Sequence, residues 1–242
     1  MSEKIQYRHE LKYRINGGTY HILRQRFRAV MMPDAHTAGG LYRVTSLYLD
    51  DAYRTAYRDK VNGALHRKKY RIRVYDLGEN VINLEEKVKD DSMGYKKSTR
   101  LTMEQYRSLL KGDCSFFADE KYADTAGGDL FASDSAVKVM PAVIVDYIRE
   151  PYVCYAGNVR ITFDMKIAAC TNSLDLFGAD NVYETVMPEN EIVLEVKYDN
   201  FLPAHIGQLL TGINTTEEAV SKFILCSDKL GEHRPLKDIY RR

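Results

Sequence analysis

The sequence predicts an α+β fold in which strands with one charged face are combined with short amphipathic helices. The segment Arg67–Lys87 supports this prediction, because its side chains alternate in character with a period of two and Asp76–Asn80 provides turn residues. The same division into a charged and an apolar face recurs in residues 8–15, 158–164 and 191–198. Repetition of this pattern indicates a sheet with one charged surface and one apolar surface.

The predicted central hairpin carries an excess of positive charge on one face. Its return strand adds Glu85 and Lys87 to the face on which the first strand places its cations. Like charges that face each other across a strand pair repel, so four cations against one carboxylate need an explanation. The cations of the first strand are Arg67, Lys69, Arg71 and Arg73.

The elements before and after this hairpin are predicted from capping and turn residues. Thr19 is expected to cap a helix that runs to about Met31. Tyr42–Asp50 is predicted to form a strand, and the short helical pattern that follows it ends near Lys60. After the hairpin, Asp90–Lys97 is predicted to be a polar loop or a strand edge.

The second half of the chain returns to strands after a helical region. The Thr102–Gln105 capping box begins a helix that Gly112 ends, and short helices are expected around the Gly127-Gly128 break. The other expected elements are strands at 142–149, 158–164 and 191–198, a loop at Ala168–Met187, a helix from Pro203 to about Leu210, a last helix between Thr216 and Gly231, and a tail at Pro235–Arg242.

Composition limits the classes of protein that fit. The 242 residues carry a formal net charge of +1, which argues against a general nucleic-acid binder, so anions must be bound by local segregation of charge. The first ten residues lack the apolar core of a signal peptide and no apolar run is long enough to cross a membrane, so we expect a soluble cytoplasmic protein. The four cysteines are far apart in the sequence, which favours buried free thiols over zinc ligation.

The charged strand faces together carry more cations than anions. On a flat sheet this would be an ordinary solvated surface. In a barrel with the charged face inward, two cations 4 Å apart would repel by about 4 kcal/mol at an effective dielectric of 20, so the interior would need an anion. The face collects Arg8, Lys12, Arg14, Arg67, Lys69, Arg71, Arg73, Lys87, Arg160 and Lys197 against Glu10, Glu85, Asp164, Glu191 and Glu195.

A chain of phosphates is the anion that these arginines, lysines and carboxylates favour. Arginine contacts phosphate oxygens in a bidentate manner, lysine adds point charges, and carboxylates on the same wall could hold a divalent metal. Neither G-x-x-x-x-G-K-[ST] nor G-x-G-x-x-G occurs, so a P-loop or Rossmann mode of phosphate binding is not supported. No Ser-His or Cys-His arrangement can be read from the chain, and covalent catalysis has no candidate.

A series of motifs between about Tyr7 and Lys222 carries a family resemblance. They are R-H-E-L-K-Y (8–13), S-L-Y-L-D (46–50), R-K-K-Y-R-I-R-V-Y (67–75), L-E-E-K (84–87), P-A-V-I-V-D-Y-I-R (141–149), V-R-I-T-F-D (159–164), L-E-V-K-Y (194–198) and S-K-F (221–223). In order and spacing the chain resembles the VTC domain of polyphosphate polymerases, within the triphosphate tunnel metalloenzyme group that includes the CYTH phosphatases. The resemblance implies a single domain over 1–242, with its core at about 7–230, that forms an antiparallel β tunnel barrel with a charged interior and helices packed outside.

The resemblance also implies which residues form the site. Glu195 matches the metal-binding glutamate, and Glu10 and Glu85 could complete a site for Mn²⁺ or Mg²⁺. One departure is Arg8, which stands where the hydrolytic CYTH members open E-x-E-x-K and so weakens the hydrolase interpretation. The expected catalytic residues are Arg71, Arg73, Lys87, Arg160 and Lys197, and the expected substrate-binding residues are Arg8, Lys12, Arg67, Lys69, Lys96, Lys97, Arg149 and Lys222.

Three functions are compatible with this site. The first is a metal-dependent polyphosphate polymerase that transfers the terminal phosphoryl group of ATP to a growing polyphosphate chain. The second is a triphosphatase that uses water as the acceptor, and the third is a polyphosphate-binding module without catalysis. The expected partners are ATP, triphosphate and polyphosphate, with no nucleic acid and with a membrane partner left open.

Overall fold

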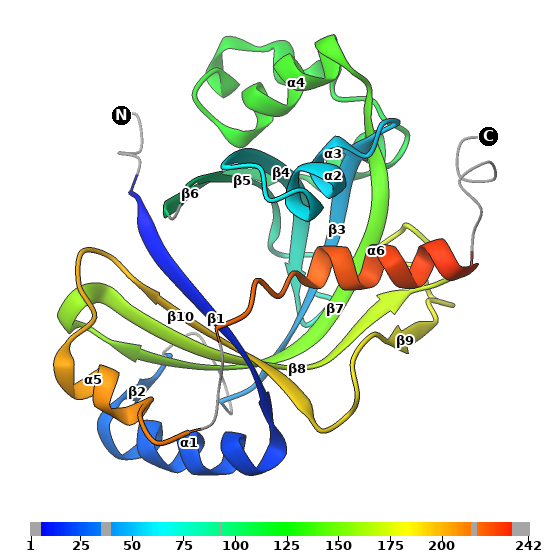
Figure 1. Cartoon of the computed structure of the whole chain (residues 1–242). Helices are drawn as coiled ribbons and strands as arrows, with labels where there is room; N and C mark the ends of the chain where they lie inside the picture. The colour runs from blue at the N-terminus through cyan, green and yellow to red at the C-terminus, as the bar shows by residue number, and fades with distance from the viewer. Residues whose placement is uncertain (1–5, 35–39, 92, 214–216, 234–242) are drawn as a thin grey trace.

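The computed structural model describes residues 6–34, 40–91, 93–213 and 217–233, in which ten strands belong to one sheet (Figure 1). All strand pairs are antiparallel. The strands are β1 Arg8–Asn16, β2 Met32–Pro33, β3 Tyr42–Asp51, β4 His66–Tyr75, β5 Ile82–Asp90, β6 Met93–Leu101, β7 Val139–Cys154, β8 Val159–Cys170, β9 Tyr183–Thr185 and β10 Glu191–Tyr198.

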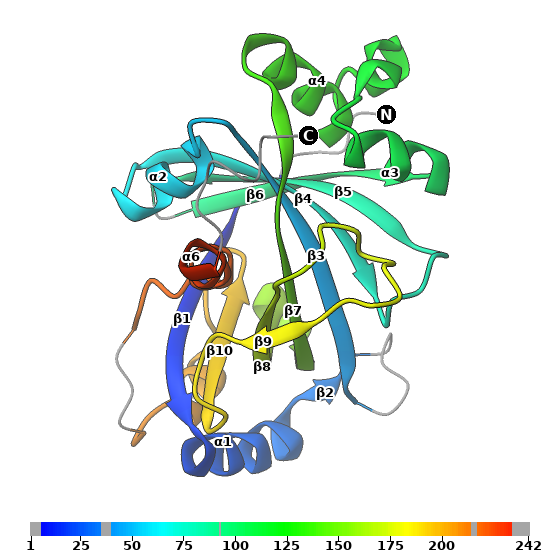
Figure 2. The same cartoon turned by 90° about the vertical axis from the view of Figure 1, so that its right-hand side faces the viewer.

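The sheet closes into a barrel, so the charged face is an interior and not a flat solvated surface. The ring runs β7-β3-β4-β5-β6-β1-β10-β8, and β8 pairs back with β7. The seam between β1 and β6 is short, since it consists of Arg8 opposite Gly94 and His9 opposite Met93. Figure 2 shows this ring from the side, with β1 and β10 facing β3 and β4 across the interior. The expected α+β tunnel barrel is confirmed.

Strand alternation explains which side chains face inward. Leu47, Ile72 and Leu84 alternate with charged or polar neighbours and pack on the outer face under α3 and α4, while Ile161 and Leu194 pack on the outer face near α1. The helices are α1 Gly17–Val30, α2 Thr55–Val61, α3 Met103–Leu110, α4 Ala126–Ala136, α5 Ala204–Leu209 and α6 Lys222–His233, with short 3₁₀ turns η1 Ser115–Ala118, η2 Glu120–Tyr122 and η3 Ala156–Asn158.

Helix α6 differs from the others because it packs against the inward face. Its Phe223 and Cys226 lie in one apolar cluster with Val145 and Ile167, and Phe223 stacks on Tyr48 with ring centroids 4.9 Å apart. The helix therefore fills one side of the barrel interior (Figure 2). Its first residue, Lys222, is carried in this way into the charged part of the interior.

Several expected boundaries are wrong for local reasons. Asn16, not Thr19, caps α1, because the Asn16 side chain accepts a hydrogen bond from the Thr19 amide. Of the two alternatives predicted for 90–97, the strand is correct from Met93 onward, since these residues belong to β6, and the mixture of polar and apolar side chains on one of its faces hid its full length. The Gly127-Gly128 pair does not break a helix but lies inside α4, capped by Thr125.

The Thr102–Gln105 capping box of α3 is confirmed. Helix α6 was expected to end before Gly231 but continues past it, and the expected loop at 168–187 contains the short strand β9. The Thr216 cap and the tail at Pro235–Arg242 lie outside the described residues. The four cysteines are free thiols, and all but Cys154 are buried. No helix in the described part of the chain is long and apolar enough to cross a membrane.

Candidate functional site

The barrel interior contains two cavities that meet at one place. The first has a volume of about 900 Å³ and is lined by the arginines of β4, β7 and β8, and the second has a volume of about 460 Å³ and opens beside α2 and residues 217–221. Glu10, Lys87 and Lys89 line both cavities. The interior is thus a charged passage whose two cavities share lining residues of β1 and β5.

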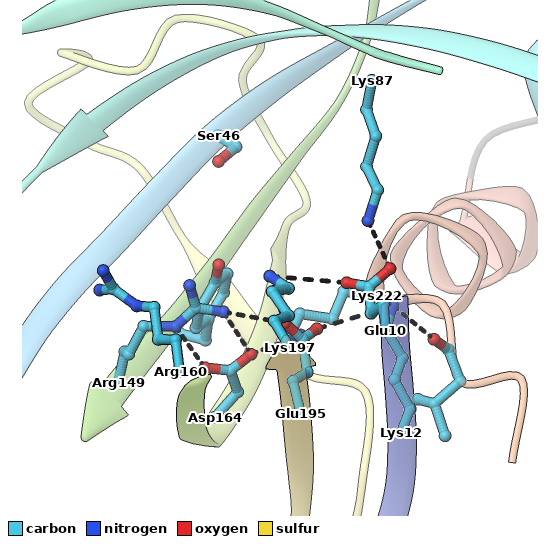
Figure 3. A network of polar contacts seen from close by, with 12 residues as sticks. Glu10, Lys12, Ser46, Lys87, Arg149, Arg160, Asp164, Glu195, Lys197 and Lys222 are labelled. Atoms are coloured by element: carbon cyan, nitrogen blue, oxygen red, sulfur yellow. Dashed lines mark hydrogen bonds and ion pairs between the residues drawn. The ribbon is translucent and has the colours of Figure 1, made fainter. Parts of the chain in front are cut away.

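Glu195 on β10 lies at the centre of a cluster of cations (Figure 3). Its side chain is 5% exposed, and Lys222 Nζ donates to its Oε1 at 2.7 Å while Lys197 Nζ lies 3.1 Å from its Oε2. Lys12 and Arg149 complete the surroundings at 3.6 and 3.4 Å. Burial by itself raises the pKa of this carboxyl, but the neighbouring cations, Lys197 foremost, hold it well below its usual value.

Asp164 on β8 extends this cluster toward the first cavity. Arg149 binds it in a bidentate manner, with Nε and Nη2 at 2.6 and 2.7 Å from the two carboxylate oxygens, and Lys222 Nζ lies 2.5 Å from Oδ2. Asp164 is fully buried. It therefore acts as a counter-ion that fixes Arg149 and Lys222 in position, as Figure 3 shows.

Glu10 on β1 lines both cavities and is surrounded by lysines. Lys87 Nζ donates to its Oε2 at 2.6 Å, and Lys197 and Lys12 lie 3.5 and 3.8 Å from its Oε1. Burial raises the pKa of Glu10, but these three lysines lower it well below the usual range. Glu10 is therefore ionised at neutral pH.

A second cluster lies on the central hairpin. Arg71 and Lys96 each contact Glu85, with shortest N to O distances of 2.7 and 2.6 Å, and Arg73 lies 3.8 Å from it. Arg73 also donates to Ser46 Oγ at 3.0 Å and to Tyr147 Oη at 3.1 Å. Glu85 is buried, and despite that burial the arginines hold its pKa far below the usual value.

Arg160 and Lys69 occupy opposite ends of the passage. Arg160 contacts Asp34 at 2.8 Å and donates to Tyr42 Oη at 3.0 Å in the first cavity. Lys69 lines the second cavity and makes no contact with a carboxylate among the described residues. Burial, with Lys12 and Arg71 nearby, lowers the pKa of Lys69 to about 8.

Three expected substrate-binding residues lie away from these clusters. Arg8 forms an ion pair with Asp199 at 2.9 Å on the rim of the first cavity. Arg67 donates to the Ala64 carbonyl and lines the second cavity. Lys97 points outward and contacts Asp129 of α4 at 2.6 Å, because its neighbour Lys96 faces the interior.

Comparison with known proteins agrees with this geometry. A family model described as the VTC domain matches residues 7–230. The chain belongs to the VTC domain family. No curated protein matches it significantly.

Three solved structures are similar to this VTC domain over most of its length. A protein from Hippeastrum, described as an adenylyl cyclase with dominant triphosphatase activity, is 13% identical, with coverage of 95% of this chain and 99% of that chain and a TM-score of 0.54. The PH1819 protein of Pyrococcus horikoshii OT3 is 14% identical, with coverage of 92% and 99% and a TM-score of 0.49. A protein of Bacillus halodurans described as an adenylate cyclase is 9% identical, with coverage of 86% and 87% and a TM-score of 0.46.

These findings support a function that involves triphosphate or polyphosphate. At 13% identity and a TM-score of 0.54 the Hippeastrum structure shows the fold alone, and the family match carries the relation to polyphosphate. A chain of phosphates would neutralise many of the interior cations at once.

Glu10 and Glu195 are the two neighbouring carboxylates of the passage that would hold a divalent metal if this VTC domain binds one. Both contact Lys12 and Lys197, so they lie close together in the passage. Mg²⁺ and Mn²⁺ need only one or two protein carboxylates when water and phosphate oxygens complete their shell. No group of three or more His, Cys, Asp or Glu in the described residues is placed to hold a metal, and Glu85 instead binds Arg71 and Lys96.

Sequence reasoning missed several residues of the interior. Ser46 and Tyr48 on β3 and Tyr147 on β7 hold the hairpin arginines, since Tyr48 Oη accepts from Arg71 at 3.1 Å. Asp34, the partner of Arg160, was also missed. Strand alternation could have identified three of them, because Ser46 and Tyr48 lie two residues apart on one face, as do Tyr147 and Arg149.

Proposed function

We propose that this VTC domain is a metal-dependent polyphosphate polymerase that transfers the terminal phosphoryl group of ATP to a growing polyphosphate chain. The observation that carries the proposal is the passage itself. Its two cavities share Glu10 and Lys87, so a linear phosphate chain can occupy both, and the second cavity holds Lys60, Arg67 and Lys69 without carboxylate contacts among the described residues. Water as an acceptor would need no second cationic cavity.

The reaction balances without a general base. The bond between the γ-phosphorus and the β,γ-bridging oxygen of ATP breaks, and a terminal oxygen of the chain forms the new bond to that phosphorus. The products are ADP and a chain that is longer by one unit, with no proton gained or lost when all groups are fully ionised. Among the described residues the passage is lined mainly by arginines, lysines and carboxylates, which suits catalysis by positioning and charge stabilisation.

The residues of the passage have separate tasks in this proposal. Arg71, Arg73 and Arg149 bind phosphate oxygens, while Glu85 and Asp164 keep their guanidinium groups oriented. Lys12, Lys197 and Lys222 surround Glu195 and balance the charge of the transferred group. Glu195 and Glu10 would hold Mg²⁺ or Mn²⁺, which when bound neutralises developing charge on phosphate oxygens.

The test is a product analysis. Purified protein is incubated with ATP and Mn²⁺ or Mg²⁺, and long polymer is separated from orthophosphate on a gel. We expect a polymer whose phosphate content equals the ADP released. Orthophosphate without polymer would identify a triphosphatase, and binding of polyphosphate without either product would identify a binding module. A cytoplasmic location is part of the same proposal. Localisation of the protein in cells tests it, together with the membrane partner that the sequence leaves open.

A further inference from the structure

The two cavities differ in their aromatic lining. His9, Tyr42, Tyr75 and Tyr95 line the first cavity, whereas no aromatic residue of the described chain lines the second. Both cavities contain lysines and arginines, so both suit phosphate. The first cavity alone combines cations with rings, and it is also the larger of the two. The two ends of the passage therefore differ in the ligand groups that they can contact.

Two of the four rings face the interior. Tyr75 follows Arg73 by two residues on β4 and therefore shares its inward face. Tyr42 on β3 accepts a hydrogen bond from Arg160 at 3.0 Å, and the ring centroids of Tyr42 and Tyr75 are 5.7 Å apart. Both tyrosines are only partly buried, so ring surface stays accessible from the cavity.

The other two rings pack against aromatic neighbours on the outer face. His9 stacks on Tyr198, with centroids 4.9 Å apart and planes 19° apart. Tyr95 contacts Tyr7 edge-on at 5.3 Å and lies next to the inward-facing Lys96, so its ring points away from the interior. Tyr42 and Tyr75 are therefore the rings beside the phosphate-binding arginines.

We propose that Tyr42 and Tyr75 form the nucleoside subsite of the passage. The nucleobase of a nucleoside triphosphate stacks on them, and its triphosphate extends over Arg73 and Arg71 toward Lys87. The second cavity, without rings, takes phosphate only. Stacking on an aromatic side chain accepts any base, so this subsite prefers purines for their larger surface without reading base identity. The inference rests on the proposed function in that it takes a nucleoside triphosphate as the substrate.

The experiment compares two ligands that differ in the nucleoside. Dissociation constants for ATP and for tripolyphosphate are measured by calorimetry without divalent metal, so that no turnover occurs. In Tyr75→Leu we expect ATP to bind about fivefold or more weakly while tripolyphosphate changes less than about twofold. Tyr75→Phe keeps the ring and should bind both ligands as the original protein does. Tyr95→Leu is the matched control, because Tyr95 belongs to a strand that lines the same cavity while its ring packs on Tyr7 on the outer face.

The outcomes separate this inference from the proposed function. An unchanged ratio of the two dissociation constants in Tyr75→Leu would overturn the subsite, and equal weakening of both ligands would show that Tyr75 acts through Arg73 instead. Failure of the unaltered protein to bind either ligand would overturn the proposed function. If Tyr75→Leu does not fold, ATP and UTP are compared on the unaltered protein. Tighter binding of ATP supports stacking, and equal binding overturns it.

Discussion

Lys87 and Glu10 form an ion pair across the barrel interior, with 2.6 Å between Nζ and Oε2, at the point where the two cavities meet. Burial lowers the pKa of Lys87 well below its usual value, and Glu10 opposes that shift. A phosphate chain that extends from one cavity to the other passes this pair. In the proposed function, Lys87 therefore exchanges its contact with Glu10 for contacts with phosphate oxygens.

Replacement of Glu10 by Gln removes the negative charge from this point. In the absence of metal we expect tripolyphosphate to bind severalfold more tightly, because three lysines lose their internal anion. Calorimetry without metal measures this effect. Weaker binding in Glu10→Gln would show that the carboxylate orients Lys87 instead of competing with phosphate.

Glu195→Gln separates a metal ligand from a simple counter-ion. The change keeps the size of the side chain and one acceptor oxygen but removes its charge, so we expect most turnover to be lost while tripolyphosphate still binds without metal. Turnover is measured across a titration of Mn²⁺. Glu191→Gln on the same strand is the control, since Glu191 contacts Arg14 at the surface. Near-normal turnover in Glu195→Gln would contradict the metal role.

The pair of changes Arg71→Ala and Arg73→Ala affects both binding and stability. Triphosphate affinity should fall about tenfold or more, because two bidentate donors are lost. The free energy of unfolding should fall by about 3–5 kcal/mol, since among the described residues buried Glu85 keeps only Lys96 as an ion-pair partner. Adding Glu85→Gln should restore stability but not affinity. Restored affinity in the triple variant would remove these arginines from the phosphate site.

Anions that match the passage should stabilise the fold. A ligand that binds only the native state raises stability by mass action, by about 2.7 kcal/mol at a hundred times its dissociation constant. Tripolyphosphate spans several cations of the passage, so we expect it to raise the melting temperature more than sulfate at equal ionic strength. Calorimetric melting curves test this. Equal effects of the two salts would argue against a site for a phosphate chain.

Lys69 should make ligand binding depend on pH. Its pKa of about 8 lies below the unfolded value near 10.4, so the folded protein releases this proton first. Anion affinity should therefore fall as the pH rises through about 8, whereas the stability of the ligand-free protein gains from this group between about pH 8 and 10. Lys69→Arg keeps the charge and should remove this part of the pH dependence. An identical profile in Lys69→Arg would assign the titration to another group or to the ligand.

The strands and their inward faces could be predicted from the sequence because these features are local. Alternation in Arg67–Arg73 and 191–198 depends on the pleat of a single strand, and the α3 cap depends on four consecutive residues. Strand β6 was predicted only as one of two alternatives, because each of its faces carries a lysine: Lys96 contacts Glu85 on one side and Lys97 contacts Asp129 on the other.

The amino-acid sequence by itself determined that one face of these strands is charged and that this charge is mostly positive. Only the tertiary structure decided that the face closes into a passage, since closure depends on the pairing of β7 with β8, and that α6 places Lys222 beside Glu195. Tertiary structure also placed Glu85 among the arginines, away from Glu10 and Glu195. Such choices depend on strand register around the whole ring and on long-range packing, which no local pattern of residues encodes.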